Sequence, residues 1–230
     1  MERQLSELLR AVIAGKTSIV SRLLAANPEL ARAQVSTGAT RQHASEYFFQ
    51  SIAHYAYAGD TALHMAAAAF ERPAAELLVR SGADCRARNR RGAEPLHYAA
   101  DANRWKPDAQ KHTIEVLLAA GADPNALDKS GVSPLHRAVR TRASEAVRAL
   151  LAGGAAVRSR NGNGSTPLHL AVQDTGRGGA GSERARTEQV RIISILLAAG
   201  ARATDKDGKG KTVIDASANE RIRMLLIDAG

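Results

Sequence analysis

The tetrapeptide TPLH at residues 166–169 and the heptapeptide LLAAGAD at residues 117–123 contain the pattern that decides the fold of this chain. Variants of the tetrapeptide recur as TALH at 61–64, EPLH at 94–97 and SPLH at 133–136, so their histidines are separated by 33, 39 and 33 residues. Variants of the heptapeptide end at residues 84, 156 and 202, and a glycine stands eight residues after each ending. Because these three features keep the same register relative to one another, the sequence contains an internal repeat.

The composition of the motif has a physical explanation. A threonine or serine in its first position caps a helix, and proline in the next position suits the first helical turn. The leucine is expected to point into the core, and the small residues after it let neighbouring helices approach closely. The Gly-Ala pair near the end of the heptapeptide is typical of a left-handed helix cap. The tetrapeptide and the heptapeptide together therefore predict a pair of helices in each repeat.

These strings and their period resemble the ankyrin repeat, and the resemblance covers nearly the whole chain. It implies an all-α solenoid in which each repeat is a helix–turn–helix followed by a short β-hairpin. Degenerate copies of the motif at residues 6–9 and 212–215 bring the count to six repeats. Three positions depart from the pattern, with Ala62 in place of proline, Glu94 in place of threonine and Asp215 in place of histidine. Atypical terminal repeats are expected, because their outer faces meet water.

Insertions interrupt the period at three places. We expect a single domain over 1–230, divided into an N-terminal capping repeat at 1–34, an inserted helix at 35–58, repeats at 59–91, 92–130 (with an insertion at 101–112), 131–163 and 164–209 (with an insertion at 173–188), and a C-terminal capping repeat at 210–230.

The first insertion holds five of the eight aromatic residues of the chain. Ala44, Phe48, Ile52 and Tyr55 have helical spacing, which predicts an amphipathic helix near residues 40–56. One interpretation is a lid packed on the first repeats. The other is a partner-binding surface, because aromatic residues are enriched in interface hot spots.

The composition excludes several classes of protein. Apolar residues make up 44% of the chain and charged residues 24%, so global disorder is not expected. A single cysteine, Cys85, excludes an internal disulfide framework and a cysteine-based zinc site. No secretory signal and no apolar stretch long enough to cross a membrane is found, which predicts a cytoplasmic location.

Motifs that would indicate an enzyme are weak. The two GKT strings, at 15–17 and 210–212, lack the earlier glycine of a phosphate-binding loop. The string GRGGAG at 176–181 matches a dinucleotide fingerprint in form, but it lies in an insertion after a helix. One motif histidine per repeat, about 10 Å from the next, cannot chelate a shared metal ion. We therefore expect no catalytic residue, no cofactor, no metal and no enzymatic activity.

The net charge of +9 is concentrated in two of the loops that follow the heptapeptides, which we call tips. Residues 85–91 carry +4 and residues 157–163 carry +2, whereas 124–130 and 203–209 are balanced. In the ankyrin family, partners are usually held by the tips and by the exposed side of the first helices. By register, the expected partner-binding residues are Tyr57, Arg86, Arg88, Arg90, Arg91, Tyr98, Asp101, Lys129, Ser130, Arg137, Arg140, Thr141, Arg158, Arg160, Asn163, Gln173, Asp174 and Lys209.

We expect a protein–protein interaction module, monomeric by itself, that binds a protein with an acidic surface. The competing interpretation is that the basic tips are simply solvated. Nucleic-acid binding through the same tips is an alternative, although the balanced tips interrupt the stripe of charge. A third possibility is an anion- or nucleotide-handling enzyme that uses the loop at 176–181.

Overall fold

The computed structural model of this chain describes residues 2–40, 42–101, 106–173 and 182–228. Contacts between residues divide the chain into two compact units, Met1–Asp123 (unit 1) and Pro124–Gly230 (unit 2). Each unit is described by itself. The described residues contain no helix that is both long and apolar enough to cross a membrane.

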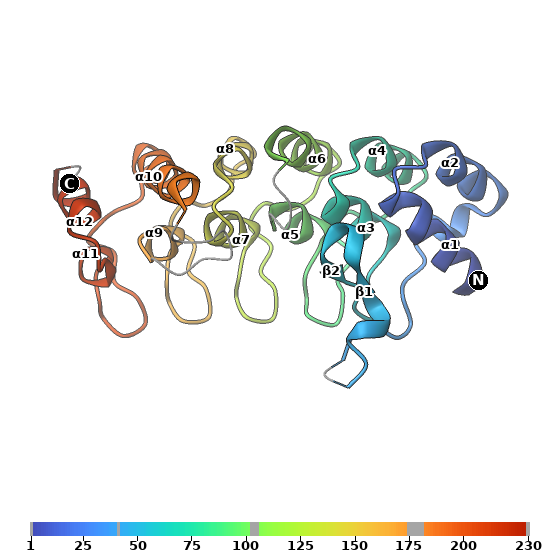
Figure 1. Ribbon diagram of the computed structural model, residues 1–230, viewed down its shortest axis with the longest axis horizontal. Coiled ribbons are helices and arrows are strands. Elements are labelled where there is room, and N and C mark those ends of the chain that lie inside the picture. The colour runs from blue at the N-terminus through green and yellow to red at the C-terminus, as the bar shows by residue number, and fades with distance from the viewer. Residues whose placement is uncertain (1, 41, 102–105, 174–181, 229–230) are drawn as a thin grey trace. The chain divides into compact units, whose positions relative to one another are not determined.

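The described residues of unit 1 form three pairs of helices, which are labelled in Figure 1. The pairs are α1 (Glu2–Ile13) with α2 (Thr17–Ala26), α3 (Ala62–Ala69) with α4 (Arg72–Arg80), and α5 (Pro95–Ala100) with α6 (Pro107–Ala119). The first helices of the pairs, α1, α3 and α5, pack side by side in an inner row, and α2, α4 and α6 form an outer row. A 3₁₀ helix, η1 (Pro28–Ala31), follows α2.

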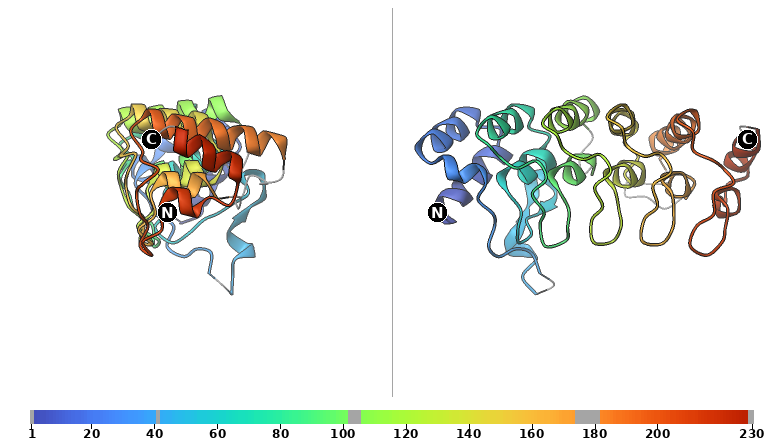
Figure 2. Two further views of the ribbon diagram at one scale, coloured as in Figure 1. Left: turned by 90° about the vertical axis from the view of Figure 1, so that its left-hand side faces the viewer. Right: turned by 180° about the vertical axis from the view of Figure 1, so that it is seen from behind.

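Unit 2 repeats this arrangement with α7 (Pro134–Arg140) and α8 (Ser144–Ala152), α9 (Pro167–Ala171) and α10 (Glu183–Ala198), and α11 (Val213–Ala216) and α12 (Glu220–Asp228). Helix α9 contacts both α7 and α11, and α8 contacts α10. Within each unit the tips project from the same side of the helix pairs (Figure 2). The predicted class of helix–turn–helix repeat is confirmed.

The motif forms the first turn of each inner helix in the way its chemistry predicts. At Thr61 the backbone N–H donates to Nδ1 of His64 over 3.1 Å, so the ring proton of His64 is on Nε2. That Nε2 donates to the carbonyl of Ala93, at the end of the next tip, over 3.1 Å. His136 and His169 donate in the same way to the carbonyls of Ser165 and Lys211. The histidines are therefore structural ties between consecutive repeats.

The motif leucines point into the core, as expected, and are at most 1% exposed; they are Leu63, Leu96, Leu135 and Leu168. The alanines that follow them are equally buried, and their small side chains let the helices of the inner row pack closely. Gly82 ends α4 in the left-handed region, at φ +84°, where a side chain would be strained. There the N–H of Ala83 donates to the carbonyl of Leu78 over 2.9 Å, so that this carbonyl in the last turn of α4 has a hydrogen-bond partner.

The second and third insertions lengthen outer-row helices. Helices α6 and α10 have 13 and 16 residues, whereas α4 and α8 have nine each. The added residues extend the start of each helix, so part of both predicted insertions is helical. Residues 102–105 and 174–181 of those insertions lie outside the described residues.

The predicted helix over 40–56 is wrong. This insert instead contains two 3₁₀ turns, η2 (Ser45–Tyr47) and η3 (Gln50–Ile52), and a hairpin of β1 (Phe48–Phe49) and β2 (His54–Tyr55). Aromatic residues favour paired strands, and Ala53 adopts φ 48°, which no regular helix allows. The register pairs Phe48 with Tyr55 and Phe49 with His54.

The insert packs on unit 1 through part of its surface. Ile52 is fully buried and Ala56 is 2% exposed. The ring of His54 lies 4.3 Å from the ring of Tyr98 on α5, so the hairpin, drawn in front of α3 in Figure 1, contacts the inner row. The expected short β-hairpins at the tips are present only as turns: the isolated bridges Gln34–Thr61 and Lys206–Thr212 are the only strand pairing described outside the insert.

Candidate partner-binding surface

One asparagine or aspartate side chain, which is not among the predicted residues, organises each tip. Asn89 accepts, through Oδ1, the backbone N–H groups of Arg91 and Ala93 over 2.9 and 3.1 Å. The same two bonds, to the residues two and four positions later, are made by Asp128, Asn161 and Asp207. The signal in the sequence was an asparagine or aspartate three residues before each tip glycine. This bond fixes the shape of the loop and hence the direction of its side chains.

Two of the predicted arginines in the tip at 85–91 bind residues of the repeat that follows. Arg88 forms an ion pair with Glu94, with 3.1 Å between Nε and Oε1. Burial raises the pKa of Glu94, although the hydrogen bond from Arg88 opposes that rise. Arg86 donates from Nε to the carbonyl of Gly121 over 3.0 Å. Both arginines remain exposed, but Arg88 already has an acidic partner.

Arg90 and Arg91 both stack on Tyr57, which lies in the insert just before the motif of the same repeat. Their guanidinium carbons lie 5.3 and 5.1 Å from the centre of the ring, within the range of a cation–π interaction. Arg91 also donates to the hydroxyl of Tyr57 over 3.1 Å, and Arg90 donates to the carbonyl of Ala39 in the insert. Within the described part of the chain, neither guanidinium forms an ion pair with a carboxylate.

Two predicted partner-facing residues of unit 1 are buried, which corrects the expectation that they are exposed. Tyr98 is 1% exposed, and its hydroxyl donates to Oδ2 of Asp60 over 2.9 Å and accepts from Nδ2 of Asn89 over 2.8 Å. Asp101 is 5% exposed at the end of α5. Tyr98 is covered because His54 of the insert stacks on it.

In unit 2, Arg137 and Thr141 are also buried, at 8% and 5% exposed, so the expectation of exposure is corrected here too. Arg137 forms an ion pair of 2.9 Å with Asp128, and the hydroxyl of Thr141 donates to the carbonyl of Arg137. Burial alone would raise the pKa of Asp128, but Arg137 and two backbone N–H groups outweigh it and lower that pKa. Arg140, at the end of the same helix, is exposed.

The two predicted arginines in the tip at 157–163 bind the tip that follows. Arg158 makes two bonds to the carboxylate of Asp205, of 2.9 Å from Nε and 2.6 Å from Nη2. The hydrogen bond from Arg158 lowers the pKa of Asp205. Arg160 donates to the carbonyls of Gly164 and Lys206. The charge of Arg158 is therefore balanced by a neighbour.

The other predicted residues of unit 2 that the structure describes are exposed; they are Lys129, Ser130, Asn163, Gln173 and Lys209. The backbones of consecutive tips touch here, because the N–H of Gly162 donates to the carbonyl of Ser130 over 3.0 Å. A Cβ on Gly131 would lie 2.7 Å from the nitrogen of Gly162, so glycine is needed at that contact. Asp174 lies outside the described residues.

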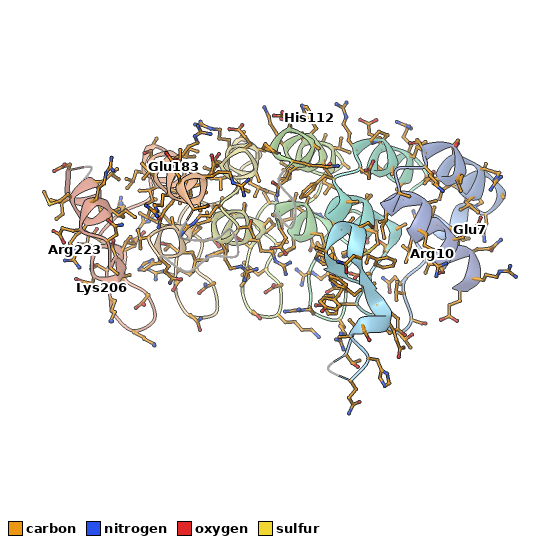
Figure 3. All side chains as sticks on the ribbon, viewed as in Figure 1. Glu7, Arg10, His112, Glu183, Lys206 and Arg223 are labelled. Carbon is orange, nitrogen blue, oxygen red and sulfur yellow. The ribbon has the colours of Figure 1, made fainter. Side chains whose placement is uncertain are left out.

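The side chains that could carry the chemistry of an enzyme are Cys85 and the candidate metal ligands. Burial raises the pKa of Cys85, whose thiol donates to the carbonyl of Ala120, and this favours the unreactive protonated form. No three His, Cys, Asp or Glu side chains of the described residues are arranged to hold a metal ion. His112, for example, lies on α6 and projects outward from that helix (Figure 3). The glycine-rich string at 176–181 lies outside the described residues.

Comparison with protein families agrees with the repeat pattern. Residues 58–90 and 91–129 each match the model described as ankyrin repeat, and residues 117–171 match the model described as ankyrin repeats (many copies). No curated protein matches the chain.

Proposed function

This chain belongs to the ankyrin-repeat family, whose repeats generally serve as protein–protein interaction modules, and we propose that it is a non-enzymatic module that binds a protein with an acidic surface. Fold membership supports only the general statement. The acidic character of the partner rests on the charge of the tips.

The observation that carries the proposal is the state of three arginines in one tip of unit 1. Arg86, Arg90 and Arg91 are exposed, and the bonds of their guanidinium groups go to carbonyl oxygens or to Tyr57 rather than to carboxylates. Their positive charge is therefore uncompensated, although their side chains are already held in place. A partner that supplies carboxylates would form ion pairs with these side chains, and little conformational entropy would be lost on binding because the side chains are already ordered.

Unit 2 has exposed lysines of its own at two tips, Lys129 and Lys209. Arg158 contributes less, because Asp205 already pairs with it. The expectation of a monomeric protein in the cytoplasm stays a prediction.

The test is capture of partners from a cell lysate with a triple charge reversal. The variant R86E/R90E/R91E should lose the proteins that the unmodified chain enriches, and those proteins should carry acidic segments. The matched control is R3E/R22E/R80E, which makes the same change of charge at exposed positions on α1, α2 and α4. Equal capture by all three proteins, or equal loss in both variants, would contradict the proposal.

Nucleic-acid binding, the alternative function, makes a different prediction for the same two proteins, the unmodified chain and the R86E/R90E/R91E variant. Affinity for nucleic acid would fall linearly with the logarithm of the salt concentration. A gel shift at low salt that the R86E/R90E/R91E variant abolishes would therefore favour the alternative over a protein partner.

A further inference from the structure

Three aromatic rings and two guanidinium groups of unit 1 form a continuous series, which we call the aromatic ladder. Phe48 and Tyr55 have ring centres 4.7 Å apart, and the rings of Tyr55 and Tyr57 are 6.4 Å apart. Arg90 and Arg91 continue the series, since both stack on Tyr57. The ladder thus begins as an apolar surface and ends as a cationic one.

Two parts of the chain that are distant in sequence build the ladder. The register of the hairpin places Phe48 opposite Tyr55, which puts the two rings on the same face. The tip at 85–91 supplies the arginines, and the bond from Arg90 to the carbonyl of Ala39 ties that tip to the insert. These contacts hold the ladder in place before any ligand binds.

One ring of the ladder is exposed and the other two are half-buried. Tyr55 is 37% exposed and is one of the few large apolar residues that the described chain leaves at its surface. Phe48 and Tyr57 are half-buried, whereas Ile52 is fully buried. The insert therefore has two sides: one packs on unit 1, as a lid does, and the other displays aromatic rings next to uncompensated charge.

The dimensions of the ladder fit an extended peptide. Side chains on one face of an extended chain repeat every two residues, about 6.6 Å. The 6.4 Å between the rings of Tyr55 and Tyr57 matches that repeat. Because the guanidinium carbons of Arg90 and Arg91 lie 5.3 and 5.1 Å from the same ring centre, they are within about 10.4 Å of each other. Two carboxylates at alternate positions of a peptide can reach both.

We propose that the aromatic ladder is a docking site for an extended acidic peptide segment that carries two carboxylates at alternate positions and an apolar side chain two residues further along. The carboxylates pair with Arg90 and Arg91, and the apolar side chain lies on Tyr55 and Phe48. The proposal rests on the proposed function, because it assumes an acidic protein partner, and it adds the place and the pattern of the contact.

The test is fluorescence anisotropy with a labelled synthetic peptide of serines, with glutamates at its third and fifth positions and phenylalanine at its seventh. The R90Q and R91Q variants should each bind it about 3- to 5-fold more weakly, as expected for an exposed ion pair. The Y55S variant should bind it about 5-fold more weakly, because an aromatic contact is lost. Y55S leaves both arginines and the buried Ile52 in place, so it keeps the test valid if R90Q loosens the insert.

Two controls make the test specific. R72Q removes the same charge from α4, where Arg72 is exposed and paired with Glu76, and it should change the affinity less than about 2-fold. A peptide with serine in place of its phenylalanine should bind more weakly than the first and should not distinguish Y55S from the unmodified protein.

The possible outcomes separate this proposal from the previous one. If the arginine variants bind weakly but neither Y55S nor the serine peptide has an effect, the ladder is not the site, and the acidic-partner proposal stands. No detectable binding to the unmodified protein, or an equal loss with R72Q, would also overturn the ladder proposal. The capture experiment then decides the proposed function independently.

Discussion

Replacing Tyr98 by phenylalanine should destabilise unit 1 by about 2–4 kcal/mol. The hydroxyl of Tyr98 donates to the carboxylate of Asp60 and accepts from the amide of Asn89, and all three side chains are at most 5% exposed. A buried hydrogen bond to a charged group is worth about 1.5–3 kcal/mol and a neutral one about 1 kcal/mol. The ring itself stays, so no large cavity adds to the loss.

The matched control is Y55F. Tyr55 is exposed, and none of the hydrogen bonds described above involves its hydroxyl, so this variant should change stability by less than about 0.5 kcal/mol. Because the chain has two compact units, one unfolding transition need not report on both.

The assay is therefore amide hydrogen exchange of the full chain, read separately in α3 and α5 and in the helices of unit 2. Exchange in α3 and α5 should accelerate about 30- to 1000-fold in Y98F, which corresponds to the expected loss of stability. The helices of unit 2 serve as an internal reference. A change below about 2-fold in α3 and α5 would refute the account of the Asp60–Asn89–Tyr98 cluster.

Three further predictions concern single residues. D205N should lower the melting temperature at pH 7, and the difference from the unmodified protein should vanish at acid pH. The pKa of Asp205 is lower in the folded protein than in the unfolded chain. Its carboxylate therefore stabilises the fold above the pKa of the unfolded chain, and this stabilisation is lost as the pH falls through the pKa of the folded protein. A difference independent of pH would contradict this. E94T should raise stability at pH 7 by about 1 kcal/mol in urea titrations, because it keeps a capping side chain and removes a buried carboxylate whose Oε2 has no partner. The gain should shrink as pH falls through the raised pKa of Glu94, and a less stable E94T at pH 7 would refute the reasoning. I52A should cost about 2–4 kcal/mol by the same titration, since Ile52 is fully buried, whereas Q50A at an exposed position should cost almost nothing; equal stability of the two variants would show that the insert does not pack as described.

The repeat fold was predictable because each local signal agrees with the others. A capping residue, a proline, a leucine and a histidine in sequence specify one helix start, and Gly82 with its equivalents specifies the end of the second helix. Such short-range rules hold in each repeat, and the register then placed almost every helix.

The insert was not predictable in the same way. Ala44, Phe48, Ile52 and Tyr55 have helical spacing, but the sequence does not reveal that Ile52 would be buried against unit 1 or that Ala53 would adopt a left-handed conformation. Tertiary contacts outweighed a weak local preference over this short stretch. The pair Phe48-Phe49 before a turn and the pair His54-Tyr55 after it were the available signal for a hairpin.

The candidate site was predicted only in part. Counting charges located the basic tips correctly. Whether an arginine of a tip has an acidic partner, however, depends on residues far away in sequence: Arg158 and its partner Asp205 are 47 residues apart. The burial of Tyr98 and Arg137 could not be predicted from the sequence either. Both directly follow a motif histidine, at a position whose exposure depends on neighbouring loops. The stacking of Arg90 and Arg91 on Tyr57 could not be read from the sequence for the same reason.

The most direct measurement is hydrogen exchange of the full chain with and without its most strongly enriched partner. Binding at the unit 1 tip and the adjacent insert predicts slower exchange at residues 54–57 and 85–93 in the complex, and no slowing with the R86E/R90E/R91E variant. Protection confined to the outer-row helices α2, α4 and α6, with residues 54–57 and 85–93 unchanged, would contradict it.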